Sequence, residues 1–344
     1  MENTKHLERR LPAEWENACA IQLTWPHDQS IWEEEFENVI SWFKNLAKLI
    51  SERGKLLLIC QNKEEVKFYL KGYNWENIIL IESRTNDIWA RDHGGITIFE
   101  NEQPVILDYI FNGWGLKFSS NFDNQISKKI ANSGYFKSNI HRKINFVLEG
   151  GAIDSDGKGT ILTTSNCLLS VNRNENLSKT EIEDQLKSNF GAKRIHWVDY
   201  GFLAGDDTDS HIDMLARFTD EKTIVYTACS NKQDIHYLEL KMMENQLKSF
   251  KTPEGNSYNL HPLYLGRCAN NKGSRMPSSY TNFLIFNQTV FVPQYGLKED
   301  QPAIETLRQC FREKEVIGIN CLTLITQGGA LHCATMQYPE GVLR

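Results

Sequence analysis

The sequence predicts an α/β fold of about five similar units, each a β-hairpin followed by a helix and a further strand. Helix patterns alternate with short apolar strands along the chain, hairpin patterns separate these helix–strand pairs, and no proline- or serine-rich linker interrupts them. The units are roughly 50 to 90 residues apart, which is typical of structural rather than sequence repetition. A doubly wound sheet also alternates strands and helices, but it rarely places a hairpin before each helix. A closed ring of five units therefore explains the order better.

Five helix patterns are each followed by a strand pattern. The first helix ends at Gly54, and Ser178 with Glu181 has the signature of a capping box at the start of the third. The strands are short and apolar. In chain order, the pairs are 32–54 with 55–60, 123–134 with 146–148, 177–191 with 194–198, 234–250 with 263–265, and 302–312 with 316–319.

Four hairpins are expected between these pairs, because short strand patterns flank polar turns that contain Asn, Asp or Gly. The predicted hairpins are 96–99 with 105–107, 152–153 with 160–162, 214–218 with 223–226, and 283–286 with 290–292.

Composition and charge exclude several functional classes. The chain has 344 residues, of which 40% are hydrophobic and 24% charged, as in a soluble protein with a substantial core. Its formal net charge of -6 argues against sequence-independent binding to nucleic acid, which requires a basic face. The apolar run 56–60 is too short to span a membrane, and residues 1–16 are polar without a signal peptide. We therefore expect a cytoplasmic protein with no nucleic-acid or membrane partner.

The 8 cysteines are scattered, and none forms a C-x-x-C pair. This spacing argues against a zinc ribbon or a thioredoxin-type motif. Most of them lie in apolar stretches, where Cys behaves as a small hydrophobic residue, and free thiols indicate a reduced compartment. We expect at most one of them to have a chemical role.

Two segments place a carboxylate and a glycine pair just before a predicted hairpin. Asp92 stands before two glycines in 86–95, and Glu149 stands before two more in 147–152. Paired glycines permit a sharp turn or a close approach of the backbone, and loops at strand ends often carry functional groups. Each carboxylate also has an ordinary alternative role, because Asp92 can pair with Arg91 and Glu149 can be an incidental turn residue.

Two further segments add a His–Asp pair and a Cys. In the first, a strand is predicted to begin at His211, which would place His211 and Asp213 on one face. This pair suits acid–base or metal chemistry, although a solvated acidic loop is the alternative. In the second, a glycine turn leads to Cys333 in a short predicted strand. His332 would then point to the opposite face, so a base from elsewhere, such as His211, is expected to activate the thiol.

One Cys, one His and several carboxylates form a coherent set for hydrolysing a guanidinium group. The thiolate is the nucleophile, and His can move protons. A guanidinium is a poor electrophile because its charge is delocalised. Two carboxylates match its N–H fork and can hold its carbon over the sulfur. Spacing alone does not show that these residues converge.

The four segments together resemble the motifs of the agmatine deiminase family, also called the bacterial Porphyromonas-type peptidylarginine deiminase family. The matching motifs are NDIWARDHGG at 86–95, EGG at 149–151, GDDTDSHID at 205–213 and GGALHC at 328–333. The resemblance covers nearly the whole chain. It implies the pentein fold, a single catalytic domain over residues 1–344 in which five ββαβ-type units form a five-bladed α/β propeller with pseudo-fivefold symmetry and a central site. The order of elements described above agrees with this implication.

The resemblance also implies roles for the matching residues. Cys333 resembles the family's nucleophile, and His211 resembles its general acid and base. Asp92 and Asp213 resemble the two carboxylates that clamp the guanidinium. Trp89 resembles the aromatic residue that packs on the substrate.

Further positions belong to the substrate pocket by the same resemblance. Glu149 and Asp207 match its acidic positions, and Gly329 of the last motif is expected to line it. The chain departs from the family pattern at Ala152, where Asn or Ser is common, and at Gly95, where Pro is common. Neither departure replaces a proposed reacting group.

The activity implied is hydrolysis of agmatine to N-carbamoylputrescine and ammonia through a covalent thiouronium intermediate on the Cys, with no metal or organic cofactor. The acidic run 206–209 suits the distal amine of this small cationic substrate. Free arginine is an alternative, because Arg173, Lys117 and Arg275 leave open a partner for its carboxylate. Peptidyl-arginine is another alternative, which would need an open cleft. A homodimer and a place in polyamine (putrescine) biosynthesis are further implications.

Two other classes of function stay open at this point. A metal-dependent hydrolase could use His211, Asp213 and Asp207, and metal analysis would distinguish it. A non-catalytic binding relative is less consistent with the sequence, since a pure binding protein has no chemical need for both Cys333 and His211.

Overall fold

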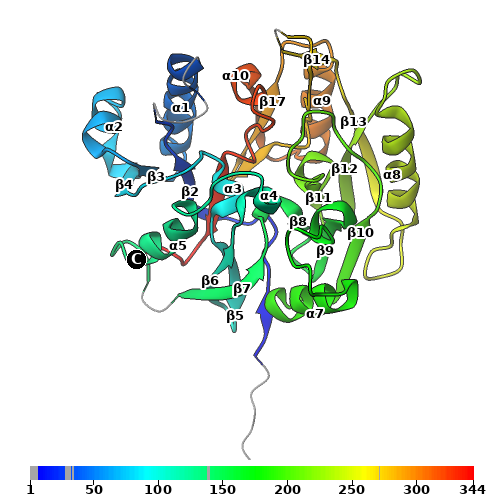
Figure 1. Cartoon of the computed structure of the whole chain (residues 1–344), viewed down its shortest axis with the longest axis horizontal. Coiled ribbons are helices and arrows are strands. Elements are labelled where there is room, and N and C mark those ends of the chain that lie inside the picture. The colour runs from blue at the N-terminus through cyan, green and yellow to red at the C-terminus, as the bar shows by residue number, and fades with distance from the viewer. Residues whose placement is uncertain (1–6, 28–31, 33–34, 138–139, 271) are drawn as a thin grey trace, which may run out of the picture.

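The computed structural model describes residues 7–27, 32, 35–137, 140–270 and 272–344. Within these residues, the strands form mixed sheets with helices on their outer sides (Figure 1). In five of the sheets, an antiparallel pair is followed by a strand that runs parallel to the second member of the pair. A helix lies between those two parallel strands in the sequence. The structure is therefore mixed α/β, with the predicted order of hairpin, helix and strand.

The first sheet joins the two ends of the chain. Its order is β19 (Thr335–Pro339), β2 (Ala18–Thr24), β3 (Lys55–Cys60) and β4 (Ile78–Glu82). β19 is antiparallel to β2, whereas β2, β3 and β4 are parallel. The connecting helix α1 (Phe36–Ser51) begins later than the predicted residue 32, and residues 33–34 lie outside the described part of the chain.

The second sheet contains the first predicted hairpin. Its order is β1 (Arg9–Arg10), β5 (Ile96–Glu100), β6 (Gln103–Ile110) and β7 (His141–Val147). The two turn residues, Asn101 and Glu102, have φ values of 47° and 63°. Positive φ at both positions matches the two-residue turn whose twist suits a hairpin. The predicted helix 123–134 divides into a 3₁₀ turn, Asp123–Gln125, and α5 (Ile126–Ala131).

The other three sheets confirm the remaining hairpins. The predicted capping box is also present, because the Glu181 N–H donates to the Ser178 hydroxyl at 3.3 Å and the Glu181 carboxylate accepts from the Ser178 N–H at 2.8 Å. The sheets and their helices are β8 (Ile153–Ser155), β9 (Thr160–Thr164) and β10 (Arg194–Val198) with α7 (Lys179–Phe190); β11 (Ala216–Asp220), β12 (Thr223–Ala228) and β13 (Asn259–Tyr264) with α8 (Tyr237–Ser249); and β16 (Leu284–Phe286), β17 (Thr289–Gln294) and β18 (Glu315–Asn320) with α9 (Asp300–Cys310).

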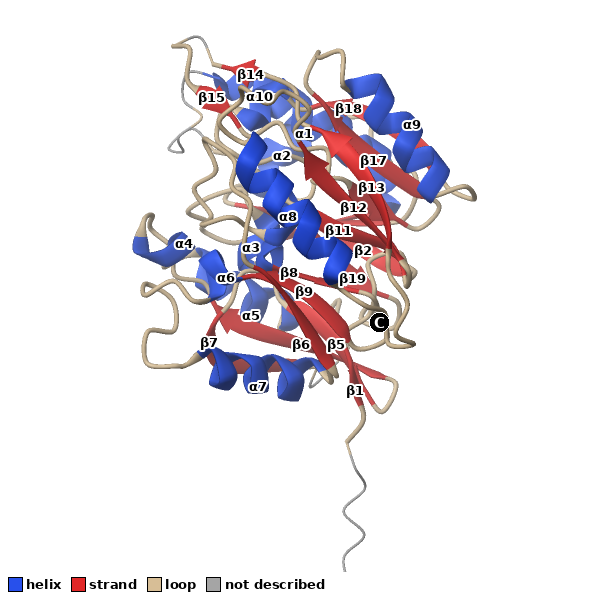
Figure 2. Cartoon of the chain, turned by 90° about the vertical axis from the view of Figure 1, so that its right-hand side faces the viewer, coloured by secondary structure: helices blue, strands red, loops and turns tan. Residues whose placement is uncertain are grey.

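Short elements connect the units, and Figure 2 shows the sheets following one another from β5–β7 at the bottom to β17–β18 at the top. These short elements are the helices α2 (Lys63–Tyr69), α3 (Ala90–His93), α4 (Gly113–Leu116), α6 (Ser165–Leu168) and α10 (Leu322–Ile325), the 3₁₀ turns Trp75–Asn77, Gly150–Ala152 and Ile212–Met214, and the strand pair β14 (Cys268–Ala269) and β15 (Arg275–Met276).

Two local predictions are wrong. Residues 211–218 do not form one strand, because His211 precedes a 3₁₀ turn and β11 begins only at Ala216. Cys333 does not lie in a strand either, because it sits in a turn before β19 begins at Thr335. Both segments are held by contacts with other units of the fold, and such contacts override the local alternation of polar and apolar residues.

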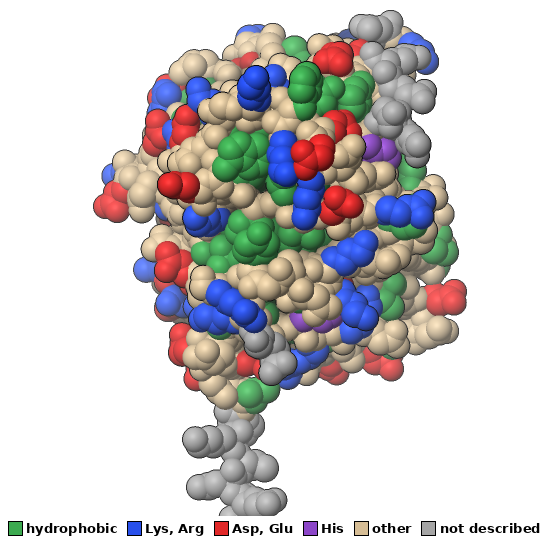
Figure 3. Space-filling view, turned by 90° about the vertical axis from the view of Figure 1, so that its left-hand side faces the viewer, with side chains coloured by type: hydrophobic (Ala, Val, Ile, Leu, Met, Phe, Trp, Pro, Cys, Tyr) green, Lys and Arg blue, Asp and Glu red, His purple; other side chains and the backbone are tan. Residues whose placement is uncertain are grey.

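The core lies between the helices and the sheets. α1 buries Val39, Phe43, Leu46 and Ile50, which recur every three or four residues along one face of the helix. Burial of each large apolar side chain contributes about 1.5–3 kcal/mol. On the face shown in Figure 3, basic and acidic side chains are interspersed. Among the helices of the described residues, none has the length and apolarity needed to cross a bilayer.

Candidate active site

A pocket of about 320 Å³ lies between α3 and the turn that holds Cys333. Five of the predicted site residues line it, whereas His211, Asp213 and Glu149 are fully buried and do not. The residues that line the pocket are Trp89, Asp92, Trp114, Asp207, Thr208, Met214, Gln327, Gly328, Gly329 and Cys333.

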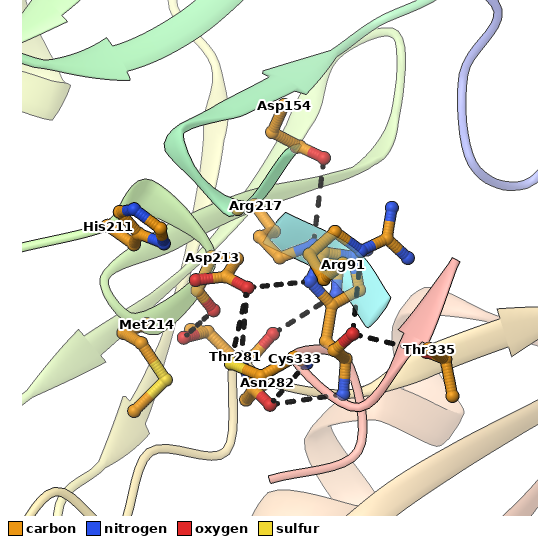
Figure 4. A network of polar contacts seen from close by, with 12 residues as sticks. Arg91, Asp154, His211, Asp213, Met214, Arg217, Thr281, Asn282, Cys333 and Thr335 are labelled. Carbon is orange, nitrogen blue, oxygen red and sulfur yellow. Dashed lines mark hydrogen bonds and ion pairs between the residues drawn. The ribbon is translucent and has the colours of Figure 1, made fainter. Parts of the chain in front are cut away.

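The Cys333 thiol faces two polar side chains. Its Sγ lies 3.0 Å from Asn282 Nδ2 and 3.6 Å from Asp213 Oδ2, and the three side chains point toward one another in Figure 4. Burial raises the pKa of Cys333 well above its ordinary value, and the charges of Asp213 and Asp92 raise it further. A cation placed between these carboxylates would offset the effect of their charges on the pKa of Cys333 and so favour the thiolate.

Asn282 is a site residue that the sequence analysis missed. Its Oδ1 accepts the backbone N–H of His332 at 3.0 Å and that of Cys333 at 3.3 Å, so one amide fixes both the backbone and the sulfur. Asn282 lies just before β16, the strand that begins the hairpin of the fifth unit. The other predicted site segments also precede a hairpin or antiparallel strand, so the same rule applied to the fifth unit would have found it.

Asp213 uses its two carboxylate oxygens differently. Oδ2 accepts from His332 Nδ1 at 2.7 Å and from Asn282 Nδ2 at 3.2 Å. Oδ1 is buried and has no hydrogen-bond partner among the described residues. Burial raises the pKa of Asp213, but the hydrogen bond and charge of His332, with the charges of His211 and Arg217, lower it below its ordinary value. A buried, ionised oxygen without a donor is suited to receive an N–H of a cationic ligand.

Asp92 is held from two sides. Its Oδ2 accepts from Trp114 Nε1 at 2.9 Å, and its Oδ1 accepts from the Gly151 N–H at 3.1 Å. Burial raises the pKa of Asp92 to about 6, with Asp213 also raising it, while His211 and Trp114 lower it. At neutral pH, Asp92 is therefore largely ionised and oriented toward the pocket.

His211 lies next to Asp92, with 3.5 Å between Nδ1 and Asp92 Oδ1. Burial lowers the pKa of His211, but the charge of Asp92, the thiol of Cys167 and the charge of Glu149 outweigh burial and raise it to about 10. His211 is therefore protonated at neutral pH and can act as a general acid. Its Nδ1 lies beside Asp92, which lines the pocket, and the ring also lies against the Cys167 thiol.

Gly151 is the point where these groups meet. A β-carbon at this position would lie 2.6 Å from His211 Nδ1, 2.8 Å from Asp92 Oδ1 and 3.1 Å from Asp213 Oδ2. Only glycine fits between the three side chains, which explains the second glycine after Glu149. The sequence analysis noted the glycine pair but did not place Gly151 in the site.

Glu149 does not face the pocket. Both of its carboxylate oxygens lie 3.0 Å from Arg173 Nε, and it supports the charge of His211 from behind. The donor atoms of Glu149, Cys167 and His211 lie within 4.8 Å of one another and are of the types that bind zinc. Arg173 already pairs with both carboxylate oxygens of Glu149, and its positive charge disfavours a metal ion at this cluster.

The three cations considered for a substrate carboxylate are all paired. Arg173 also contacts Asp209 at 2.6 Å, and Lys117 contacts the other oxygen of Asp209 at 2.6 Å. Arg275 pairs with Asp234 at 3.2 Å. Asp207, in contrast, is exposed at the rim of the pocket. The described lining therefore contains acidic side chains and no basic one.

Two tryptophans form walls of the pocket. Trp89 packs so closely against Gly329 that a β-carbon on residue 329 would lie 2.5 Å from the indole ring. Gly329 lines the pocket, as predicted. Trp114 was missed, although glycines flank it on both sides in the sequence. All residues of Gly113–Leu116 have positive φ, with 56° at Trp114. This left-handed turn costs roughly 1–2 kcal/mol at each non-glycine residue and directs the indole N–H at Asp92.

Known proteins share both the sequence pattern and the fold. Residues 10–339 match the sequence model described as Porphyromonas-type peptidyl-arginine deiminase. A Legionella pneumophila protein named "Putative agmatine deiminase" is 31% identical over 339 residues, which cover 96% of this chain and 94% of that protein. A cysteine-to-serine variant of C. jejuni agmatine deiminase with substrate bound has a TM-score of 0.92 and 36% identity over 98% of both chains. The Enterococcus faecalis agmatine deiminase has a TM-score of 0.87 and 28% identity, covering 97% of this chain and 96% of that one.

Proposed function

We propose that this chain, which belongs to the Porphyromonas-type peptidyl-arginine deiminase family, hydrolyses agmatine to N-carbamoylputrescine and ammonia. The enzyme is a hydrolase that acts on a C–N bond of a guanidinium group. One observation carries the proposal: a buried thiol and two ionisable carboxylates adjoin a small pocket whose described lining is acidic. This arrangement suits a small substrate with a cation at each end.

The guanidinium is held by two carboxylates. Asp92 and the free Oδ1 of Asp213 accept its N–H groups, which places its carbon near Cys333. The charge of the substrate offsets the carboxylates that raise the pKa of the thiol. Trp89 and Trp114 enclose the planar group and exclude water.

Two chemical steps follow. The Cys333 thiolate attacks the guanidinium carbon, and protonated His211 gives its proton to the leaving nitrogen, so that the C–N bond breaks and ammonia departs. A thiouronium remains on the sulfur. Neutral His211 then takes a proton from water, the resulting hydroxide attacks the same carbon, and the C–S bond breaks to return the thiolate and release the ureido product. As the C=O bond of the product forms, the remaining hydroxyl proton is released to solvent, where the free ammonia takes it up as ammonium.

The distal end of the substrate decides between agmatine and arginine. A free arginine carboxylate would need an unpaired cation, whereas Arg173, Lys117 and Arg275 are all engaged with carboxylates. The exposed carboxylate of Asp207 at the rim suits the primary amine of agmatine instead. This comparison supports agmatine over free arginine.

We also propose that residues 1–344 are one catalytic domain of the pentein type. The repeated order of antiparallel pair, helix and parallel strand in five sheets supports a five-bladed propeller with pseudo-fivefold symmetry. The site residues come from segments that precede β5, β8, β11, β16 and β19. Convergence of these equivalent positions on one axis would bring together residues far apart in the sequence.

The test is ammonia release from agmatine, arginine and a blocked arginyl peptide, with Cys333→Ala as the control. Turnover of agmatine alone, lost in the variant, supports the proposal. Turnover restricted to arginine or the peptide would keep the chemistry and overturn the choice of substrate. Full activity in Cys333→Ala, or a stoichiometric metal that turnover requires, would overturn the mechanism.

A further inference from the structure

A chain of hydrogen bonds leads from Asp213 away from the pocket. His332 Nδ1 lies 2.7 Å from Asp213 Oδ2, and His332 Nε2 lies 2.8 Å and 3.0 Å from the two oxygens of Glu14. His332 and Asp213 are fully buried, and the side chain of Glu14 is 12% exposed. Glu14 lines a separate pocket of about 450 Å³ with Arg91 and Asp154. The chain therefore links the residues beside the thiol to the lining of this second pocket.

Two arginines hold the far end of this chain. Arg91 contacts Glu14 Oε1 at 3.0 Å, and Arg217 contacts the other oxygen, Oε2. Burial raises the pKa of Glu14, but the charges of Arg217, Arg91 and His332 hold it well below the ordinary value. Glu14 is thus a fixed carboxylate acceptor for His332 Nε2.

The geometry demands a shared proton. An imidazole donates to a carboxylate on each side only when both ring nitrogens carry hydrogen. Burial and the charges of Arg217 and Arg91 lower the pKa of His332, while Glu14 and Asp213 raise it. Since Glu14 is ionised, the two short contacts require one additional hydrogen on His332 or between His332 and Asp213. In either placement, Asp213 Oδ2 receives a strong hydrogen bond, and its other oxygen stays free.

We propose that Glu14, His332 and Asp213 form a relay in which His332 is a positioning residue, fixing Asp213 Oδ2 beside the thiol and leaving Oδ1 for the guanidinium. The inference rests on the proposed function and deepens it. His332 touches no reacting atom, and its effect passes through Asp213. The other charged or titratable groups that face the relay are Arg91 and Asp92 from α3, Asp154 from β8, His211 from the loop before β11, Arg217 from β11, and Cys333.

A matched pair of variants separates the two hydrogen bonds of His332. The amide of Asn reaches the position of Nδ1, so His332→Asn can still donate to Asp213. The longer side chain of Gln reaches the position of Nε2, so His332→Gln can contact Glu14 but not Asp213. Loss of the bond to Asp213 removes the donor that fixes Oδ2, so the carboxylate can turn and kcat/KM falls in His332→Gln at a pH where Asp92 is ionised.

The expected result near neutral pH is a kcat/KM about tenfold lower in His332→Gln than in the wild-type enzyme, with a smaller loss in His332→Asn. Glu14→Gln, which keeps an acceptor for Nε2 but removes the charge, is a second route if the His332 variants fold poorly. His141→Gln is the control, because His141 forms a comparable 2.8 Å pair with Asp108 outside the pocket. An unchanged kcat/KM in His332→Gln, or a larger loss in His332→Asn, would overturn the relay.

A second readout does not depend on agmatine. The labelling rate of Cys333 by iodoacetamide, followed by peptide mass spectrometry against pH, reports the charge beside the thiol. The relay requires a different labelling midpoint in His332→Gln than in the wild-type protein, and identical midpoints would overturn it. If wild-type protein fails to turn over agmatine yet the labelling midpoint changes, the substrate assignment fails and the relay stands.

Discussion

The side-chain amide of Asn282 holds Cys333 from two directions. Nδ2 donates toward the sulfur at 3.0 Å, and Oδ1 accepts the backbone N–H of Cys333 at 3.3 Å. The same Nδ2 also lies 3.2 Å from Asp213 Oδ2. The amide therefore fixes the position of the thiol. It also gives the sulfur a hydrogen-bond donor, whereas the other polar side chains near the sulfur are carboxylates.

Replacement of this amide should weaken catalysis without changing the shape of the site. In Asn282→Asp, a carboxylate of the same size replaces the donor and adds a negative charge, so the pKa of Cys333 rises further and less thiolate forms. We expect kcat/KM for agmatine to fall about a hundredfold, comparable to the loss of one positioned donor elsewhere. Steady-state kinetics with agmatine measure the effect.

The control for this substitution is Asn62→Asp. Asn62 caps α2 and is exposed, and Asp is an equally good cap. This variant should keep wild-type kinetics. Retention of full activity in Asn282→Asp would show that the amide acts only on the backbone.

The pH dependence of the free enzyme should follow Asp92 and His211. The pKa of Asp92 is raised to about 6, so below this pH its carboxylate takes up a proton and no longer binds the guanidinium. The pKa of His211 is raised to about 10, so above this pH it loses the proton needed by the leaving nitrogen. We therefore expect a bell-shaped profile of kcat/KM between these limits.

One control removes the ambiguity at high pH. The primary amine of agmatine titrates in the range of a lysine side chain, so it could produce the same alkaline limb. Butylguanidine lacks this amine, and its profile should retain both limbs. An acidic limb near pH 4, the range of an ordinary carboxyl group, would mean that Asp92 does not control binding.

Gly151 should not tolerate even one additional carbon. In Gly151→Ala, the β-carbon would lie under 3 Å from His211 and Asp92, both of which are fixed by burial. The groups must separate, and a displacement of about 1 Å typically costs a hundredfold in kcat. Overpacking should also lower the free energy of unfolding by about 1–3 kcal/mol, measured by urea denaturation.

Gly72→Asn is the matched control for the loss of a glycine. No atom lies within 4 Å of a β-carbon at Gly72, and Asn tolerates its positive φ of 89° better than other residues do. Wild-type kinetics are expected. If Gly151→Ala keeps wild-type kcat, the proximity of its three neighbours has no catalytic importance.

The elements predicted from sequence were those that local patterns determine. The hairpin turn at Asn101-Glu102 and the capping box at Ser178 depend on a few adjacent residues, so their signals are complete in the sequence. β19 pairs with β2 across nearly the whole chain, and no local pattern encodes that register. The position of Asn282 before a hairpin was visible in the sequence, but its role as a donor to the thiol appears only when the fold brings Cys333 to it.

The acidic rim should act on affinity rather than on chemistry. Asp207 is exposed at the pocket, and we expect it to attract the distal amine of agmatine. Asp207→Asn should therefore raise KM for agmatine several-fold and leave kcat nearly unchanged, because an exposed ion pair contributes about 0.2–1 kcal/mol. Its effect should shrink at high salt, where exposed charges are screened.

Butylguanidine provides the decisive comparison for this residue. It carries the same reacting group and lacks the amine, so its KM should be the same for the wild-type enzyme and Asp207→Asn. The KM difference between the two substrates then isolates the pairing of one carboxylate with one amine, as a double-mutant cycle does. An equal rise in KM for both substrates would mean that Asp207 shapes the loop that includes Thr208, and the recognition of the distal amine would have to be sought elsewhere along the rim.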